Sequence, residues 1–144
     1  MTKKIDQLSI IIPILNEGKN IKQLLFKILK NIKITKYEII FVDDNSEDNT
    51  AKVFREIKKN NNRINLIVRK SKKRDLSKSC VLGFKVSKYK NIMVMDGDLQ
   101  HDPSYISKFL STASKEQCDV VVGCRDLINQ KKIGINFFRK LISQ

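Results

Sequence analysis

The sequence has little of several residue types that define particular classes of protein. Its 144 residues include two prolines and five glycines, which leaves no composition for a flexible linker. The three cysteines lack a CxxC spacing, so we expect reduced thiols and not a disulfide scaffold or a zinc site. No apolar run approaches the roughly 20 residues that a membrane-spanning helix needs, and no apolar segment follows the charged N-terminus as in a signal peptide. One compact domain is therefore expected, either soluble or peripheral to a membrane.

Several catalytic and nucleotide-binding motifs are also missing. There is no GxGxxG and no GxxxxGK[ST], so neither a dinucleotide fold nor a P-loop is supported. The single histidine, His101, is the only residue on which Ser-His-Asp chemistry could draw. Its place in a predicted turn favours a solvated loop residue over a general base.

The excess of positive charge is the most unusual number in the composition. Lys and Arg total 29 against 15 Asp and Glu, which gives a net charge of +14. Such a balance points to nucleic acid, an anionic membrane surface or a phosphorylated substrate. The alternative is that lysines simply populate solvated faces. The run RKSKKR at residues 69–74 has no interleaved aromatics, so it is read either as a solvated loop or as a contact for phosphate or anionic lipid.

Short apolar runs alternate with helical patterns along the chain. The runs predict buried strands at residues 9–15, 37–42, 64–68, 91–95 and 119–123. Apolar residues at helical spacing predict helices within residues 21–32, 51–57, 76–86, 106–113 and 135–142. Asp102 and Pro103 suit the N-cap and the first position of the fourth helix. This alternation predicts an α/β fold, with a mostly parallel sheet flanked by helices.

Acidic residues stand directly after three of the predicted strands. Glu17 follows the first, Asp43 and Asp44 follow the second, and Asp96 and Asp98 follow the fourth. Open α/β sheets bind ligands at the carboxyl ends of their strands, so these side chains are expected to share one edge. Carboxylates gathered there repel one another unless a cation or hydrogen-bond donors offset their charge.

The segment Asp96-Gly97-Asp98 is the sharpest single signal. In an extended chain its two carboxylates point the same way, Gly97 lets a ligand approach the backbone, and Gln100 adds an amide oxygen. Oxygen ligands suit Mg²⁺ or Mn²⁺, so we predict a metal site there. The alternative is an acidic turn that closes a strand and caps the next helix. Arg125, directly after the fifth predicted strand, is expected at the same edge.

Four short motifs follow one another in order along the chain. They are PILNE at residues 13–17, VDDNS at 42–46, MDGDLQH at 95–101 and VGCR at 122–125. In this order they resemble the family 2 inverting glycosyltransferases of the GT-A fold. Within that family, the sequence is most similar to polyprenyl-phosphate (dolichyl-phosphate) mannosyl- or glucosyltransferases. The resemblance extends over about residues 9–143.

The resemblance implies a role for each matching position. The nucleotide-sugar donor, of the GDP-mannose or UDP-glucose type, would be bound by Pro13, Leu15, Glu17, Val42, Asp44, Asp96, Gly97 and Asp98. The metal, Mg²⁺ or Mn²⁺, would lie among Asp96, Asp98 and Gln100, and the catalytic residues would be Asp98 and Arg125. Arg125, Arg139 and Ser143 would contact the phosphate of a polyprenyl phosphate acceptor. Because that acceptor is already anionic, it needs little help from a general base, and in-line attack would invert the anomeric configuration.

The same resemblance implies cytoplasmic placement, peripheral on the cytoplasmic face of a membrane. The cations would then suit an anionic lipid surface and phosphate groups, with no nucleic acid partner. Leu15 stands where an aromatic is common, Asp126 where Tyr is usual, and residues 72–77 lack the glycine-rich spelling of many relatives. The chain stops at Gln144, where relatives continue. Residues 1–144 are therefore expected to be a nucleotide-sugar-binding domain truncated at its C-terminal side.

Two readings without glycosyl transfer remain open from the sequence. A receiver-type signalling domain has a similar length and a strand end like residues 42–45, although it would begin with that strand. A basic α/β binding module would use the lysines to contact nucleic acid without catalysis. The order of the strands and the surroundings of the acidic residues discriminate between these classes.

Overall fold

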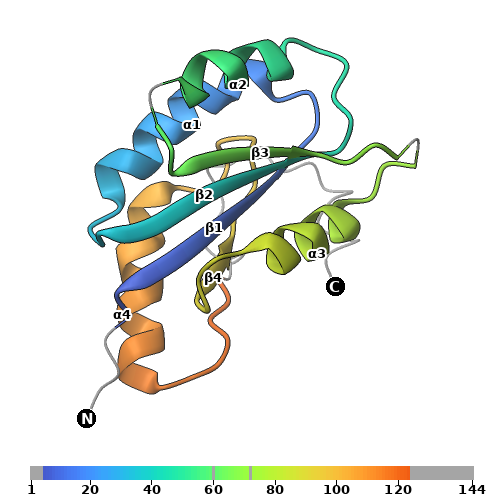
Figure 1. Cartoon of the computed structure of the whole chain (residues 1–144). Coiled ribbons are helices and arrows are strands. Elements are labelled where there is room, and N and C mark those ends of the chain that lie inside the picture. Colours follow the sequence, from blue (N-terminus) through green and yellow to red (C-terminus); the bar gives the residue numbers. More distant parts are fainter. Residues whose placement is uncertain (1–4, 60, 72, 124–144) are drawn as a thin grey trace, which may run out of the picture.

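The computed structural model describes residues 5–59, 61–71 and 73–123, and it confirms the predicted α/β class. Within these residues, four strands form one sheet, with helices on both faces (Figure 1). The strands are β1 (Gln7–Ile14), β2 (Lys36–Asp43), β3 (Ile64–Val68) and β4 (Ile92–Val94). The helices are α1 (Gly18–Asn31), α2 (Thr50–Lys58), α3 (Leu76–Val86) and α4 (Ile106–Glu116), with a 3₁₀ turn, η1 (Pro103–Tyr105), before α4. Asp102 caps this turn by accepting a hydrogen bond from the Ser104 N–H, as predicted.

The strand order is β3-β2-β1-β4, and every pairing is parallel. β1 is paired with β2 along its whole length, from Gln7 opposite Lys36 to Ile14 opposite Asp43. On its other side β1 meets β4. Receiver-type domains have the order 2-1-3-4-5, in which the first and third strands are neighbours. The receiver reading is therefore wrong for this chain.

Successive side chains of β1 enter two separate cores, as expected for a strand covered on both faces. Ile10 and Ile12 point into the larger core, beneath α1, α2 and α4. Ile11 points into a smaller core with Ile40 and Val42, which is covered by α3. The larger core contains the buried apolar residues Leu8, Ile10, Ile12, Ile14, Ile21, Leu24, Leu25, Ile28, Ile39, Phe41, Val53, Phe54, Ile64, Met95 and Ile106.

Asp48 fastens the N-termini of α1 and α2 to each other. One carboxylate oxygen accepts a hydrogen bond from the Gly18 N–H at 3.0 Å, and the other accepts from the N–H and hydroxyl of Thr50. Burial alone would raise the pKa of Asp48, but the hydrogen bonds from Thr50 and Gly18 outweigh it and lower that pKa. The ionised carboxylate thus satisfies N–H groups at the starts of both helices, which have no partner within their own helix.

The strand predicted at residues 119–123 is wrong, because this segment forms no strand. Val120 and Val122 are 75% and 74% exposed, so their apolar side chains have no covered face to enter. An apolar run becomes a strand when it pairs with a neighbour and one of its faces is buried. Within the described residues, β4 is paired only with β1, and its Ile92 and Val94 side chains are also exposed. The helix predicted at residues 135–142 lies outside the described residues.

Two smaller expectations concern membranes and thiols. Within the described part of the chain, no helix has the length and apolar character needed to cross a membrane. Cys80 and Cys118 are free thiols, while Cys124 lies outside the described residues.

Gly83 explains why a residue with poor helix propensity stands in the middle of α3. A Cβ atom at this position would lie 2.3 Å from Cγ2 of Ile11 in β1, closer than any real contact. The absence of a side chain therefore lets α3 pack directly on the sheet. The lower helix propensity of glycine, about 1 kcal/mol relative to alanine, is offset by this packing.

We expect Gly83→Ala to destabilise the protein although alanine is the better helix former. Forcing a methyl group into a packed interface costs about 1–3 kcal/mol, which exceeds the gain in propensity. Urea denaturation measures the change in the free energy of unfolding. The control is Lys85→Ala on the exposed side of α3, which should change stability by about 0.5 kcal/mol or less. A Gly83→Ala protein as stable as the parent would contradict the close packing of α3 on β1.

Candidate functional site

The loops after β1 and β2 turn sharply at the carboxyl edge of the sheet and are joined to each other. Asn16 and Asn45 both have left-handed backbones, with φ of 57° and 64°, a conformation that asparagine tolerates better than most residues. The Asn16 side-chain oxygen accepts a hydrogen bond from the Glu47 N–H, and the Asn16 N–H donates to the Ser46 hydroxyl. The two loops therefore form one connected rim.

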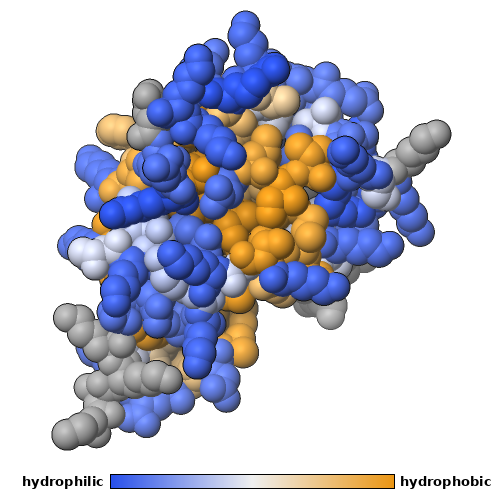
Figure 2. Space-filling view, viewed as in Figure 1, coloured by the Kyte–Doolittle hydropathy of each residue, from blue (hydrophilic) through white to orange (hydrophobic). Residues whose placement is uncertain are grey.

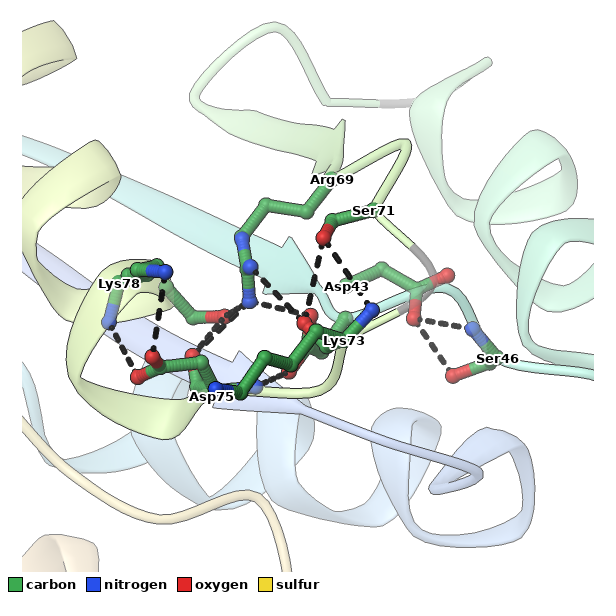
Figure 3. A network of polar contacts seen from close by, with 9 residues as sticks. Asp43, Ser46, Arg69, Ser71, Lys73, Asp75 and Lys78 are labelled. Carbon is green, nitrogen blue, oxygen red and sulfur yellow. Dashed lines mark hydrogen bonds and ion pairs between the residues drawn. The ribbon is translucent and has the colours of Figure 1, made fainter.

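Asp43 stabilises this rim from inside. It is 3% exposed, and one carboxylate oxygen accepts hydrogen bonds from the Ser46 N–H at 2.9 Å and the Ser46 hydroxyl at 2.5 Å (Figure 3). The sequence grouped Asp43 with the acidic strand ends. Its role in the structure is to close the turn after β2.

Asp44 is held by a buried ion pair with Arg69. Their side chains are 8% and 9% exposed, and the second carboxylate oxygen of Asp44 accepts a hydrogen bond from the Asp75 N–H at 2.5 Å. Arg69 also donates to the carbonyl oxygens of Asp75 and Lys73, at 2.9 and 3.3 Å (Figure 3). The guanidinium thereby joins the end of β2, the loop after β3 and the start of α3.

Arg69 is the residue of this edge that sequence reasoning missed. The sequence predicts Arg69 to be the first member of the basic loop at residues 69–74, whereas its side chain is buried. A positional signal was present, because Arg69 directly follows β3 just as Asp44 directly follows β2. Adjacent parallel strands bring such positions side by side at one sheet edge.

A cleft of about 290 Å³ opens beside this ion pair. It brings together Pro13, Leu15 and Asp44, three of the residues assigned to donor binding by resemblance. A neighbouring cleft of about 470 Å³ shares one wall residue with the first, Arg74, which pairs with Glu47 at 3.1 Å. The first cleft is lined by Pro13, Ile14, Leu15, Asp44, Arg74, Asp75, Leu76 and Ser79, and the second by Asn45, Glu47, Ser71 and Arg74.

The segment at residues 96–98 is not extended, and it packs against Pro13 and Ile14, two residues that line the first cleft. β4 ends at Val94, and residues 97–99 bend, with Leu99 left-handed at φ 67°. A Cβ on Gly97 would lie 2.6 Å from Cγ2 of Ile14, a cleft residue, so glycine is required for packing against the end of β1. The extended conformation expected from the sequence is therefore wrong. The Leu99 side chain packs on the larger core, which holds its unusual backbone in place.

The carboxylates of this turn remain partly exposed. The Asp96 N–H donates to Nδ1 of His101 at 3.1 Å, and His101 Nε2 lies 3.5 Å from an Asp96 carboxylate oxygen. One oxygen of Asp98 accepts a hydrogen bond from the Gln100 N–H at 3.0 Å. The lone histidine thus lies in a turn, as predicted, where it contacts Asp96.

Two further observations place this turn among its neighbours. The Cγ atom of Glu17 lies 3.7 Å from where a Gly97 Cβ would be, which brings the first acidic strand end to the same turn. Burial, and then the negative charge of Asp96, raise the pKa of the Cys80 thiol in α3. The acidic turn therefore lies between the loop after β1 and the first turns of α3.

The residues of the turn fit a hard divalent cation shared with a ligand. Within the described residues, no group of three or more His, Cys, Asp or Glu side chains could hold a metal ion by itself. Asp96 and Asp98 nevertheless supply two partly exposed carboxylates. Mg²⁺ and Mn²⁺ are commonly held by one or two carboxylates together with substrate phosphates and water. The donor set suits a cation that arrives with a diphosphate.

The remaining predicted residues are placed differently. Val42 is fully buried in the smaller core with Ile11 and Ile40, in a strand that is paired on both sides, so the structure exposes no part of it to a ligand. Arg125, Arg139 and Ser143 lie outside the described residues, and nothing in the structure bears on their predicted roles.

We expect Arg69→Met to lower the free energy of unfolding by about 3–5 kcal/mol, because it leaves the Asp44 carboxylate buried without its counter-charge. Urea denaturation at neutral pH measures the loss. The control is Arg74→Met, which removes an exposed partner of Glu47 and should cost about 1 kcal/mol or less. Equal losses from the two variants would contradict a special role for the buried pair.

Comparison with known proteins identifies the family of the chain. The glycosyl transferase family 2 model matches residues 9–139. The chain is 35% identical to a dolichol-phosphate mannosyltransferase of Pyrococcus furiosus over 138 residues, covering 96% of this chain and 38% of that protein. It is 32% identical to an undecaprenyl-phosphate 4-deoxy-4-formamido-L-arabinose transferase of Proteus mirabilis over 146 residues, covering 99% of this chain and 42% of that protein. The chain thus spans about two fifths of the length of these relatives.

Solved structures show the same fold. S. aureus TarS, residues 1–349, has a TM-score of 0.66 at 16% identity, covering 85% of this chain and 40% of that one. Glucosyl-3-phosphoglycerate synthase from Mycobacterium tuberculosis, solved with Mn²⁺, UDP and glucosyl-3-phosphoglycerate, has a TM-score of 0.62 at 15% identity, covering 75% of this chain and 39% of that one. These identities establish the fold alone, and it is the predicted GT-A fold. Because the family model covers nearly the whole sequence, the chain belongs to glycosyl transferase family 2.

Proposed function

We propose that this chain is the nucleotide-sugar-binding part of an inverting glycosyltransferase that transfers a hexose to polyprenyl phosphate. The observation that carries the proposal is the packing of Gly97, at the centre of the acidic turn, against Pro13 and Ile14, two residues that line the cleft with Leu15 and Asp44. The names of two relatives, a dolichol-phosphate mannosyltransferase and an undecaprenyl-phosphate sugar transferase, support a lipid phosphate as acceptor.

The donor would lie across the carboxyl edge of the sheet. The nucleoside would occupy the cleft beside Asp44, whose carboxylate is fixed by Arg69 and the Asp75 N–H. The diphosphate would then extend past Ile14 to the turn that carries Asp96 and Asp98. Donors of the GDP-mannose or UDP-glucose type fit this arrangement, since both join a nucleoside to a sugar through a diphosphate.

The acidic turn would hold the leaving group through a cation. Asp96 and Asp98, with the Gln100 side chain, would bind Mg²⁺ or Mn²⁺, and a solved relative in fold contains Mn²⁺ with UDP. When bound, the cation supplies positive charge that stabilises the departing nucleoside diphosphate. Asp98 is the proposed catalytic carboxylate in this role, and Arg125 is proposed to neutralise phosphate at the reacting centre.

The acceptor would need no dedicated general base. A polyprenyl phosphate is anionic at neutral pH and can attack the anomeric carbon directly, in line with the leaving group. His101 is therefore not required as a base in this proposal, and its contacts with Asp96 stabilise the turn. Arg139 and Ser143 are proposed to bind the acceptor phosphate. The lipid acceptor further implies peripheral placement on an anionic membrane surface, on its cytoplasmic face.

We expect GDP or UDP to raise the melting temperature of the chain only when Mg²⁺ or Mn²⁺ is present. At a ligand concentration about 100-fold above Kd, binding adds about 2.7 kcal/mol, or a shift of roughly 5–10 °C for a domain of this size. Asp98→Asn removes a cation ligand and should abolish the metal-dependent part of the shift in differential scanning fluorimetry.

The matched control for that variant is Asp6→Asn, an exposed carboxylate just before β1, at the opposite end of the strand from the candidate site. It should retain the full metal-dependent shift. Unchanged metal dependence in Asp98→Asn would remove the cation-binding assignment of the acidic turn.

We also expect radiolabel to appear in the lipid phase when the chain is incubated with labelled GDP-mannose or UDP-glucose, Mn²⁺ and polyprenyl phosphate. Polyprenol without its phosphate is the matched control and should stay unlabelled, because it lacks the anionic nucleophile. Absence of lipid-linked label with both donors would contradict activity in this chain.

A further inference from the structure

The outward faces of α1 and α2 form one surface on the side of the sheet opposite α3. The two helices pack against each other over the larger core (Figure 1). Hydrophilic side chains cover the upper edge of the molecule, where α2 lies (Figure 2). We call this surface the α1–α2 face and define it by its exposed residues, Lys19, Lys22, Phe26, Leu29 and Lys30 of α1 and Lys52, Arg55, Glu56 and Lys58 of α2.

The charge on this face is almost entirely positive. The two helices carry seven Lys and Arg residues, and Glu56 is their one carboxylate. Glu56 pairs with Lys22 at 2.7 Å across the two helices. The hydrogen bond and charge of Lys22, followed by the charges of Lys52 and Lys59, lower the pKa of Glu56. Lys22, Lys52 and Lys59 therefore lie around a single acid, which leaves the face with a net positive charge.

Phe26 interrupts this basic surface with an exposed aromatic ring. Its side chain is 67% exposed in the middle of α1, and Leu29 beside it is 37% exposed. Lys22 and Lys30 lie one turn before and one turn after Phe26 on the same face, and Lys19 lies two turns before it. Neither apolar side chain belongs to the core of the protein.

The apolar face of α1 is buried in the core, so Phe26, with lysines one turn before and after it, is the part of this helix that could enter a lipid interface. The ring enters the boundary between headgroups and acyl chains, while the lysine stems extend along it and their ammonium groups reach anionic headgroups. Single-stranded nucleic acid would be expected to meet several stacked aromatics instead, and this face has one.

We propose that the α1–α2 face docks on an anionic phospholipid bilayer, with Phe26 inserted at the headgroup boundary and the surrounding lysines on lipid phosphates. The inference rests on the proposed function in one respect, since a lipid-linked acceptor makes a membrane the polyanion that the protein must approach. α1 begins directly after the loop that carries Glu17. Docking through this helix would therefore keep the candidate site near the bilayer.

The sequence offers a direct probe, because it contains no tryptophan. Phe26→Trp introduces a single tryptophan at the proposed insertion point, which can be excited selectively over the three tyrosines. On adding vesicles of phosphatidylcholine mixed with phosphatidylglycerol, its emission should move to shorter wavelength and be quenched by brominated lipid. Phe84→Trp is the matched control, since Phe84 is 42% exposed on α3, against the opposite face of the sheet. Its emission should not change when the vesicles are added.

Charge variants test the same surface without a new fluorophore. Each Lys near an anionic bilayer adds about 1 kcal/mol, which corresponds to roughly fivefold in partitioning. Lys19→Gln with Lys30→Gln should therefore lower co-sedimentation with mixed vesicles about 25-fold at low salt. Lys85→Gln with Lys90→Gln removes the same charge from exposed positions elsewhere and should have far less effect.

Four results would overturn the proposal. An unshifted Phe26→Trp spectrum in the presence of vesicles, or equal shifts at Phe26 and Phe84, would exclude insertion of this face. Equal losses of vesicle binding from the two lysine pairs would show that binding depends on the net charge of the protein and not on this face. If Lys19→Gln with Lys30→Gln abolishes binding to a single-stranded oligonucleotide but leaves vesicle binding intact, the face is assigned to nucleic acid. The vesicles contain neither nucleotide sugar nor polyprenyl phosphate, so these outcomes are independent of the transfer assay.

Discussion

The buried ion pair between Arg69 and Asp44 is the contact on which the carboxyl edge of the sheet depends. The ladder between β2 and β3 ends where Asp43 lies opposite Val68, and the chains would be free to separate beyond it. The Arg69 N–H continues the pairing by donating to the Asp43 carbonyl oxygen at 2.8 Å, and the guanidinium then reaches Asp44 and the start of α3. One wall of the cleft is fixed by this arrangement, because Asp44, Asp75 and Ser79 all face it.

The acidic residues at this edge divide into two groups with different chemistry. Asp43 and Asp44 are buried, and their carboxylate oxygens accept hydrogen bonds from Ser46, Arg69 and the Asp75 N–H. Asp96 and Asp98 keep partly exposed carboxylates on a turn whose shape is set by Gly97 and Leu99. Internal donors thus compensate the first group, and the second group retains capacity for an external cation. The electrostatic repulsion among these carboxylates is therefore weaker in the structure than their number in the sequence suggests.

Much of the fold follows from local pattern, and the failures have physical causes. The run at residues 9–15 is correctly predicted as a strand because both faces of β1 are covered, which favours a nearly continuous apolar sequence. Residues 119–123 have the same composition but no neighbour to pair with in the described structure. The turn at residues 96–98 departs from an extended chain because Gly97 packs on Ile14, a contact that sequence spacing does not contain.

The same limit applies to the candidate site. The acidic strand ends could be placed at one edge, since parallel order alone brings them there. Burial of Arg69 could not be read from a basic loop, because it depends on which strand lies beside β3. Pro13 and Leu15 carry no chemical signal of their own, so only the family resemblance predicts that they bind the donor. In the structure both line the cleft beside Asp44.

The hydrogen bonds that Asp48 accepts at the starts of α1 and α2 affect how this edge can bind a negatively charged ligand. In dinucleotide-binding folds, the first helix after the first strand presents its free N–H groups to a pyrophosphate. Here the Gly18 N–H at that position already donates to Asp48, and a Cβ on Gly18 would lie 2.1 Å from Oδ1 of Asn49. The protein's own carboxylate occupies the place of the phosphate. Under the proposed function, a diphosphate at this edge would draw its compensating charge from side chains or from a metal ion at the acidic turn, in place of the helix dipole that serves other folds.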